Sequence, residues 1–259
     1  MSSHELFPPA AIDIRGIRLV NLANEDAENA IDAALIARTP VQIAFVNADC
    51  VNLAARDPLY RETLASMDWV FSDGIGMKIA GKMLGQPVRE NVNGTDLFPR
   101  LCAQFARSGH RVFLLGAKPG VAAQVALWAE ATYPGLVIAG SHDGYFAEAD
   151  TERVLATIRQ SGADVLFVAM GAPRQEKWIH RHAGQSGATV TLGVGGLFDY
   201  YSGNIPRAPL WMRRLGMEWA FRLIQEPGRL WKRYLLGNLA FMARVTGDRL
   251  RHSFKGNRT

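Results

Sequence analysis

The amino-acid sequence predicts an α/β protein: a Rossmann-like parallel sheet with helices on both faces, extended by a C-terminal helical appendage. Three observations predict this fold. Short runs that are apolar throughout recur along residues 41–194, helical stretches separate them, and no strand-like run follows Pro206. A parallel sheet covered on both faces requires such strands. Ligands of such sheets bind outside the carboxyl ends of the strands, so the segments directly after strands matter most for function.

The expected strands and helices alternate in chain order. Strands are expected at residues 41–47, 69–72, 111–115, 136–140, 165–170 and 189–194. Helices are expected at residues 54–65, 121–131 and 151–161. After Pro206, Trp, Arg and Leu predominate, which predicts a helical appendage broken at Pro227-Gly228. This pattern divides the chain into an α/β domain, residues 1–204, and the appendage, residues 205–259.

Composition is that of an ordinary globular protein. The 259 residues are 48% hydrophobic and 20% charged, which excludes disordered, collagenous and fibrous classes. The two cysteines, Cys50 and Cys102, lack a CxxC partner, so neither a disulfide framework nor a zinc site is expected. The start of the chain has no signal-peptide pattern, and no run reaches the roughly 18 apolar residues of a membrane-spanning helix. We expect a protein of the reducing cytoplasm.

Charge is distributed unevenly along the chain. Residues 205–259 contain twelve Lys or Arg against three Asp or Glu, whereas residues 1–204 contain 17 against 21. A basic segment on an acidic-to-neutral body indicates a polyanionic partner, either a phospholipid surface or nucleic acid. The segment has no RNA-binding or helix-turn-helix signature, so nucleic acid is not the expected partner.

Polar residues follow the first two expected strands. Asn47 ends the first strand and either caps the next helix or contacts a substrate; the sequence leaves both roles open. Asp73 and Gly74 directly follow the second strand. An Asp before Gly is common in turns. A carboxylate that leaves a buried strand, beside a glycine that lets the backbone approach a ligand, also suits a general base.

Glycine-containing segments follow three later strands. Residues 115–120 (LGAKPG) either form a tight turn or bind a phosphate at a helix N-terminus. Residues 170–178 (MGAPRQEKW) either present Arg, Gln and Glu at the sheet edge or form an ordinary helix surface. Residues 193–203 (GVGGLFDYYSG) indicate close backbone approach. Their Tyr200 and Tyr201 either stack on a base or pack in the core, and packing is favoured.

Several enzyme classes lack their signatures. The six histidines form no HExxH set, and GxSxG, P-loop and kinase patterns are absent. A dinucleotide-dependent oxidoreductase would need GxGxxG after an early strand and an acidic residue about 20 positions later, which is also missing. A non-enzymatic adaptor that binds membrane or nucleic acid through the basic tail is the alternative. It leaves the polar residues at the sheet edge unexplained.

In combination, these segments resemble the WecG/TagA/CpsF family of bacterial glycosyltransferases. The resemblance covers about residues 47–234 and rests on several motifs in a fixed order. They are Asn47, DGIG at 73–76, NGTDL at 93–97, FLLGAKPG at 113–120, SHDGYF at 141–146, GAPRQEKW at 171–178, GVGG at 193–196 and RAP at 207–209. The resemblance implies inverting transfer, without a metal or other cofactor, from a UDP-sugar to a polyprenyl-diphosphate-linked sugar during synthesis of cell-surface polysaccharide (exopolysaccharide) or teichoic acid.

The resemblance also implies site residues. Asp73 matches the proposed base that deprotonates the acceptor hydroxyl, and Asn47 and Gln175 match active-site positions. Substrate-binding residues are expected in or beside the motifs: Gly74, Arg89, Asn93, Asp96, Gly116, Lys118, Gly144, Tyr145, Gly171, Pro173, Glu176, Gly195 and Arg207. The chain departs from the family at Asn91, where Arg is usual, and Arg89 is the candidate replacement. Helix N-termini, backbone N–H groups and basic residues of the appendage are expected to stabilise the departing UDP.

The appendage resembles the segment thought to bring this family to the membrane. Aromatic side chains suit the headgroup level, and each basic side chain near anionic lipid contributes about 1 kcal/mol. The residues concerned are Trp211, Trp219, Phe221, Trp231 and Tyr234 with Arg213, Arg214, Arg222, Arg229, Lys232 and Arg233. We therefore expect a peripheral protein on the inner face of the cytoplasmic membrane. Packing of these helices on the α/β domain and self-association into a homo-oligomer are compatible with the same residues.

Overall fold

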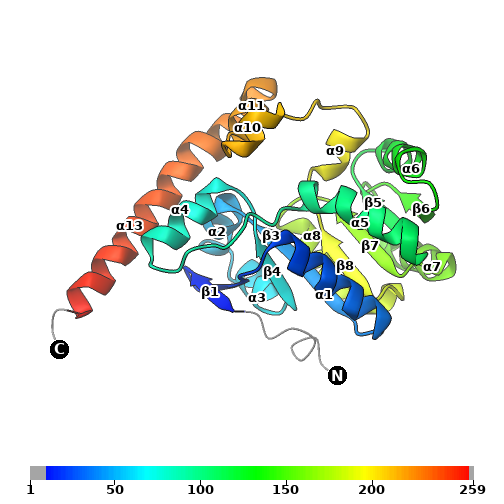
Figure 1. Ribbon diagram of the computed structural model, residues 1–259, viewed down its shortest axis with the longest axis horizontal. Helices are drawn as coiled ribbons and strands as arrows, with labels where there is room; N and C mark the ends of the chain where they lie inside the picture. The colour runs from blue at the N-terminus through cyan, green and yellow to red at the C-terminus, as the bar shows by residue number, and fades with distance from the viewer. Residues whose placement is uncertain (1–9, 257–259) are drawn as a thin grey trace.

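A six-stranded sheet forms the centre of the molecule. The computed structural model describes residues 10–256, apart from the side chains of Arg229 and of residues 251–256. The sheet has the strand order β4-β3-β8-β7-β5-β6, and neighbouring strands are parallel (Figure 1). The strands are β3 Val41–Val46, β4 Trp69–Ser72, β5 Arg111–Gly116, β6 Val137–His142, β7 Val165–Ala169 and β8 Val190–Gly193. All six predicted strands are confirmed.

Helices cover both faces of this sheet. One layer contains α1 Asn24–Ile36, α5 Gly94–Ser108, α6 Val121–Thr132 and α9 Leu197–Tyr201. The other contains α2 Ala48–Ala54, α3 Pro58–Ala65, α4 Ile75–Met83, α7 Thr151–Ser161 with the preceding turn η1 Glu148–Asp150, and α8 Arg174–Ser186. Successive residues of one strand serve opposite layers, since Phe45 belongs to the first core and Ala44 and Val46 to the second. The predicted Rossmann-like α/β architecture is confirmed.

The helix predicted at residues 54–65 has the wrong bounds. The segment forms two helices, α2 and α3, with a break between them. Pro58 occupies the first turn of α3, where its missing N–H costs nothing, but a proline cannot continue a preceding helix. Asp57 fixes the new start, because its side chain accepts a hydrogen bond of 3.0 Å from the N–H of Tyr60. The helices predicted at 121–131 and 151–161 are confirmed as α6 and α7.

A short antiparallel hairpin precedes the sheet and was missing from the sequence-based prediction. It consists of β1 Ala11–Ile14 and β2 Ile17–Val20. Arg15 and Gly16 make the turn with φ of +60° and +78°. Buried and exposed residues alternate along both strands, but each strand has only four residues. Alternation over so few residues does not distinguish a strand from a loop.

The appendage is helical, as predicted. It comprises α10 Leu210–Arg214, α11 Glu218–Gln225, α12 Pro227–Trp231, the π-helical turn η2 Lys232–Leu236, and α13 Gly237–Gly256. The predicted break at Pro227 is confirmed, since α11 ends at Gln225 and α12 begins at the proline. The segments α12, η2 and α13 follow one another without a gap and form the long orange-to-red helix of Figure 1. No helix in the described part of the chain is long and apolar enough to cross a membrane.

The long helix is packed on the α/β domain. It lies against α2 and α4, and its Phe241 and Val245 are buried in the same core cluster as Met77 and Ala80 of α4. Asn52 of α2 strengthens this contact by donating a 2.8 Å hydrogen bond to the carbonyl of Gly237. The appendage therefore shares a core with the α/β domain, and the division at residue 205 stays a prediction.

Candidate active site

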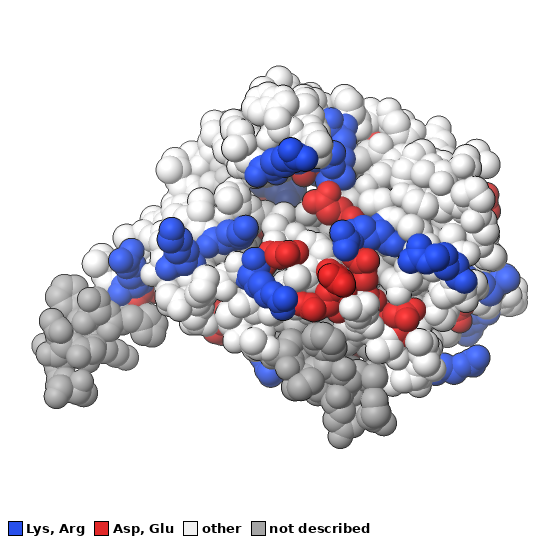
Figure 2. Space-filling model, viewed as in Figure 1, with Lys and Arg blue, Asp and Glu red and all other residues white. Residues whose placement is uncertain are grey.

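A cavity of about 340 Å³ lies at the carboxyl ends of β3 and β4, with the appendage as its opposite wall. Five of the predicted site residues line it: Asn47, Asp73, Gly74, Asn93 and Asp96. The appendage contributes Arg213, Glu218, Trp219, Arg222, Arg233 and Tyr234. Carboxylates from the sheet edge and arginines from the appendage thus line one cavity. On the face drawn in Figure 2, basic and acidic side chains lie close together around the hollow beneath α10 and α11.

Asp73 stands where β4 ends. Its backbone N–H donates to the carbonyl of Val46 at 2.8 Å, which extends the pairing of β3 and β4 by one step. Loss of hydration and the negative charge of Glu218 raise the pKa of Asp73 to about 6, although the hydrogen bond from Asn47 acts in the opposite direction. A carboxylate with this pKa is ionised at neutral pH and is a stronger base than an ordinary aspartate.

Asn47 has the capping role that its sequence position allows, and its contact with a substrate stays a prediction. Its Oδ1 accepts hydrogen bonds from the N–H groups of Asp49 at 3.0 Å and Cys50 at 3.2 Å, so it caps α2. The amide nitrogen is thereby left to donate to Asp73, with which the Asn47 side chain also forms a hydrogen bond. The cap fixes the orientation of the amide, and the amide fixes the carboxylate.

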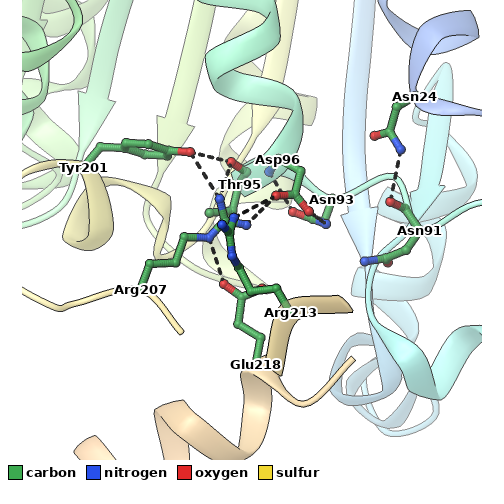
Figure 3. A network of polar contacts seen from close by, with 9 residues as sticks. All are labelled: Asn24, Asn91, Asn93, Thr95, Asp96, Tyr201, Arg207, Arg213 and Glu218. Atoms are coloured by element: carbon green, nitrogen blue, oxygen red, sulfur yellow. Dashed lines mark hydrogen bonds and ion pairs between the residues drawn. The ribbon is translucent and has the colours of Figure 1, made fainter. Parts of the chain in front are cut away.

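Gly74 and Asn91 set the direction in which the chain leaves Asp73. Gly74 has φ of +92°, a conformation that favours glycine, and its N–H donates to Oδ1 of Asn91 at 2.5 Å. Asn91 also lines the cavity, and its carbonyl accepts a 3.5 Å hydrogen bond from Nδ2 of Asn24 on α1 (Figure 3). The position at which the family usually has Arg thus holds the backbone next to the candidate base.

Arg207 joins the appendage to the start of α5. Asn93 caps α5, with its Oδ1 accepting from the N–H of Asp96 at 2.8 Å and its Nδ2 donating to Oδ2 of Asp96 at 2.8 Å. Arg207 lies between two carboxylates, 2.5 Å from Oδ1 of Asp96 and 3.0 Å from Oε1 of Glu218 (Figure 3). Burial opposes ionisation of Asp96, but the bonds from Asn93 and Arg207 outweigh it and lower its pKa.

Three arginines of the appendage reach the cavity wall. Arg213 lies 3.8 Å from Asp96, Arg222 stacks over the ring of Tyr200 at 5.3 Å, and Arg233 contacts Oδ2 of Asp49 at 3.0 Å. Arg233 belongs to the π-helical turn η2, whose altered spacing is typical of functional sites. Together they form a cationic wall opposite Asp73, to which we refer below as the arginine wall: Arg213, Arg222 and Arg233.

A second group of predicted residues lies at the ends of β5, β6 and β7, outside the cavity lining. Gly116 has φ of +139°, and a Cβ there would lie 2.4 Å from the carbonyl oxygen of Ala169, so only glycine fits. The N–H of Gly144 donates to the carbonyl of Ala117 at 2.9 Å. Lys118 and Tyr145 are exposed nearby on the same two loops. Gly171 and Pro173 form the adjoining loop after β7.

Gln175 connects these loops to the loop after β8. Its Oε1 accepts from the N–H groups of Gly171 at 3.1 Å and Gly195 at 2.8 Å, and its Nε2 donates to Glu176 at 2.7 Å. The side chain is buried and does not line the cavity. In this structure Gln175 therefore braces two loops at the middle of the sheet edge rather than facing the cavity.

Arg89, a predicted substrate-binding residue, lies away from the cavity. The sequence also does not predict which arginines form the arginine wall. The Arg89 side chain is 60% exposed and pairs with Asp26 at 2.6 Å. The sequence predicts basic residues of the appendage near the leaving group, but it does not indicate which basic residues these are. No local sequence signal distinguishes these three arginines, because the direction of each side chain depends on how α10, α11 and η2 pack against the domain. Tyr201 packs in the core, 4.4 Å from Trp128, as expected.

The pH dependence of stability tests whether Glu176 is buried beside Gln175 as the structure shows. Burial raises its pKa to about 7, so between about pH 4.5 and pH 7 the folded protein retains a proton that the unfolded chain loses. Unfolding free energy should therefore fall by about 3 kcal/mol as pH rises through this window. Glu176→Gln should abolish that loss, as measured by urea unfolding at pH 5 and pH 8. Glu130→Gln, on an exposed position of α6, is the control; equal pH dependence in all three proteins would contradict the assignment.

Comparisons with known proteins agree on one family. The model of the WecG/TagA/CpsF glycosyl transferase family matches residues 12–255. A Bacillus subtilis protein named N-acetylglucosaminyldiphosphoundecaprenol N-acetyl-beta-D-mannosaminyltransferase is 38% identical over 193 residues, which is 74% of each chain. A protein of the same name from Bacillus spizizenii is 38% identical over 182 residues, 70% of each chain. Within the described residues, no group of three or more His, Cys, Asp or Glu side chains is arranged to hold a metal ion.

Proposed function

This chain belongs to the WecG/TagA/CpsF family of glycosyltransferases, and on that premise we propose that it transfers a sugar, with inversion and without a metal, from a UDP-sugar to a polyprenyl-diphosphate-linked acceptor. The product would serve cell-surface polysaccharide synthesis. One observation carries the proposal: Asp73, with a pKa of about 6, and the arginine wall line the same cavity at the carboxyl edge of the sheet.

The proposed reaction is a single displacement. Asp73 takes the proton of the acceptor hydroxyl as that oxygen bonds to the anomeric carbon of the donor, and the bond from this carbon to the UDP oxygen breaks. Attack opposite the leaving group inverts the configuration. Negative charge moves onto the departing UDP, and the backbone N–H groups and the N-terminus of α6 at the ends of β5, β6 and β7 stabilise it without reorganisation. Asn47 keeps the carboxylate aimed at the incoming hydroxyl.

The loops after β5, β6 and β7 are the proposed seat of the nucleotide. Gly116 and Gly144 let the two loops pack against each other, since a Cβ at Gly144 would lie 3.1 Å from Cα of Gly116, and the following helix α6 directs its N-terminus to the same edge. Lys118 adds a positive charge and Tyr145 an exposed aromatic ring. Gln175 and Gly195 lie between these loops and the Asp73 cavity, so a UDP-sugar would extend from the nucleotide seat toward the base.

The acceptor class comes from the relatives. The names of both Bacillus proteins specify an N-acetylglucosaminyl diphosphoundecaprenol acceptor. We extend the general class of this acceptor, a sugar carried on a polyprenyl diphosphate, to this chain. The cavity contains a base for the sugar and cations for the diphosphate, which is the combination this acceptor requires.

Calorimetric titration with UDP in EDTA tests the donor class, with NAD as the comparison. We expect UDP to bind with a dissociation constant in the micromolar range, and NAD not to bind. No UDP binding, with or without anionic lipid, would overturn the donor assignment and favour the adaptor that the sequence leaves as the alternative.

The appendage is the proposed membrane contact. The helix α10 exposes Leu210 and Trp211, with Arg214 beside them, and Leu215 follows at its end. Apolar side chains with basic neighbours suit the interface of an anionic bilayer. The long helix adds exposed Leu235 and Leu239. This surface would hold the enzyme where a lipid-linked acceptor is available, peripheral on the inner face of the cytoplasmic membrane.

Vesicle sedimentation tests this contact. Joint replacement of Leu210 and Trp211 by Ser should weaken binding to vesicles containing phosphatidylglycerol by at least about tenfold. The reason is that the bilayer would no longer bury two apolar side chains, which are replaced by small polar ones. Leu127→Ser, at a position 69% exposed on α6, is the matched control and should bind like the wild type. An equal loss for both variants, or none for either, would refute α10 as the contact.

A further inference from the structure

One end of the cavity, between α4 and α13, is lined by three apolar side chains and one amide that the transfer chemistry does not use. Ile75 and Ile79, four residues apart on α4, line it from one side, and Asn238 and Met242, four residues apart on α13, line it from the other. The two helices lie against each other. Gly76 of α4 lies at this contact, where a Cβ would be in ordinary van der Waals contact with Ala48 at 3.5 Å and Phe241 at 3.9 Å. We call this end the α4–α13 groove.

The groove opens to the surface. Ile79 is 42% exposed although it lines the cavity, so the apolar lining continues to solvent. Leu239, next to Asn238 on α13, is also exposed. An enclosed pocket for a sugar alone would need polar groups, because sugars are recognised through their hydroxyls. An open apolar groove instead fits an extended hydrocarbon.

Three chemistries thus line one cavity. Asp73 is at the sheet edge, the arginine wall is on the appendage, and the α4–α13 groove lies between α4 and the long helix. A polyprenyl-diphosphate-linked sugar has three corresponding parts: a hydroxyl to deprotonate, a diphosphate to neutralise and a branched hydrocarbon to desolvate. We propose that the α4–α13 groove binds the first isoprene units of the acceptor. This inference rests on the proposed function and adds the part of the acceptor that the enzyme recognises beyond its sugar.

A uridine ring or a second protein fits the groove less well. The other aromatic side chains of the described cavity lining, Tyr200, Trp219 and Tyr234, belong to α9, α11 and η2. The groove between α4 and α13 has only Phe241, which is buried at its base, among its described lining residues. The arginine wall in the same cavity complements a diphosphate directly joined to the hydrocarbon. Recognition of the lipid next to the phosphates would also let the enzyme distinguish lipid-linked acceptors from free sugars.

Two acceptors that differ only in their hydrocarbon test the groove. N-acetylglucosaminyl diphosphate is esterified with farnesol or with ethanol, and transfer from the UDP-sugar is followed without vesicles or detergent, which excludes a membrane effect. The wild type should show a KM for the farnesyl acceptor at least about tenfold below that for the ethyl acceptor. Ile79→Gln should raise the farnesyl KM about tenfold, leave the ethyl KM within about twofold, and leave kcat unchanged.

Ile36→Gln is the matched control, because Ile36 is exposed at the end of α1 and does not line the cavity. It should behave like the wild type with both acceptors. Inhibition of the wild type by farnesyl diphosphate and by ethyl diphosphate gives a second measure that needs no variant, with farnesyl diphosphate at least about tenfold more potent. Transfer to both acceptors with equal KM would overturn the groove and leave the proposed function standing. Transfer to neither acceptor would overturn the proposed function itself.

Discussion

Asp73→Asn should lower kcat by about 10³-fold and leave the affinity for UDP within about twofold. Asn has nearly the same shape as Asp, so the hydrogen bond to Asn47 and the turn at Gly74 are kept, but an amide cannot accept the proton of the acceptor hydroxyl. Steady-state transfer assays and UDP calorimetry on the same preparation measure the two quantities. An adaptor that uses only the basic appendage would not respond to this substitution.

Asp32→Asn, on α1 at the other face of the sheet, is the control and should retain wild-type kcat. The pH profile adds a second readout. Since the base acts as carboxylate and burial raises its pKa to about 6, kcat/KM should be level above about pH 7 and fall as pH drops through 6. A level profile from pH 5 to pH 8, or an active Asp73→Asn enzyme, would remove Asp73 as the base.

Arg207→Met should destabilise the protein by about 2 kcal/mol and shift the pH profile of transfer upward. The substitution removes the guanidinium that lies between Asp96 and Glu218 and, among the described residues, leaves Asp96 with only Arg213, 3.8 Å away, as a cationic neighbour at the cavity wall. Both carboxylates already raise the pKa of Asp73, and without the guanidinium between them their charge acts on it more strongly. Transfer at pH 6.5 should therefore fall further than transfer at pH 8.5. The value for stability allows for the partial exposure of Asp96.

Urea unfolding and pH–rate profiles measure these two effects. Arg100→Met provides the matched control, because Arg100 pairs with Glu28 on the surface and surface pairs contribute at most about 1 kcal/mol. It should change neither quantity appreciably. If Arg207→Met were as stable as Arg100→Met and showed an unshifted profile, Arg207 would not join the appendage to the domain in the way its two ion pairs indicate.

The sequence predicts the sheet more completely than its surroundings. Five of the six strands of the sheet are largely apolar runs buried on both faces, whereas the edge strand β6 is only half-buried. The signal of a buried apolar run is strong even over four residues, as at Trp69–Ser72. The hairpin β1–β2 has strands of the same length but is buried on one face only, so its alternation is a weaker signal. The break at Asp57-Pro58 has a recognisable chemical signal, an N-cap residue followed by proline, but the helical residues on both sides of it make the segment resemble one continuous helix.

The site residues that follow strands of the sheet are predicted from the sequence, and those that depend on the packing of the appendage are not. Asn47 and Asp73 were predicted because any residue directly after a parallel strand reaches the ligand-binding edge. The arginine wall depends on the packing of η2 against α2, of α10 against α5 and of α11 against α9, which no local pattern encodes. Arg89 was selected by nearness in sequence to Asn91, yet the chain directs it to Asp26 on α1. Whether the predicted residues outside the cavity bind the donor stays a prediction.

The most direct test is a transfer assay in EDTA with UDP-N-acetylmannosamine and N-acetylglucosaminyl diphosphate carried on a prenyl chain. Product is identified by mass spectrometry, and its anomeric configuration by NMR. We predict an inverted disaccharide product from the wild type and none above background from Asp73→Asn. Product formed equally by both proteins, product with retained configuration, or product that appears only when a divalent cation is added would contradict metal-independent inversion by Asp73.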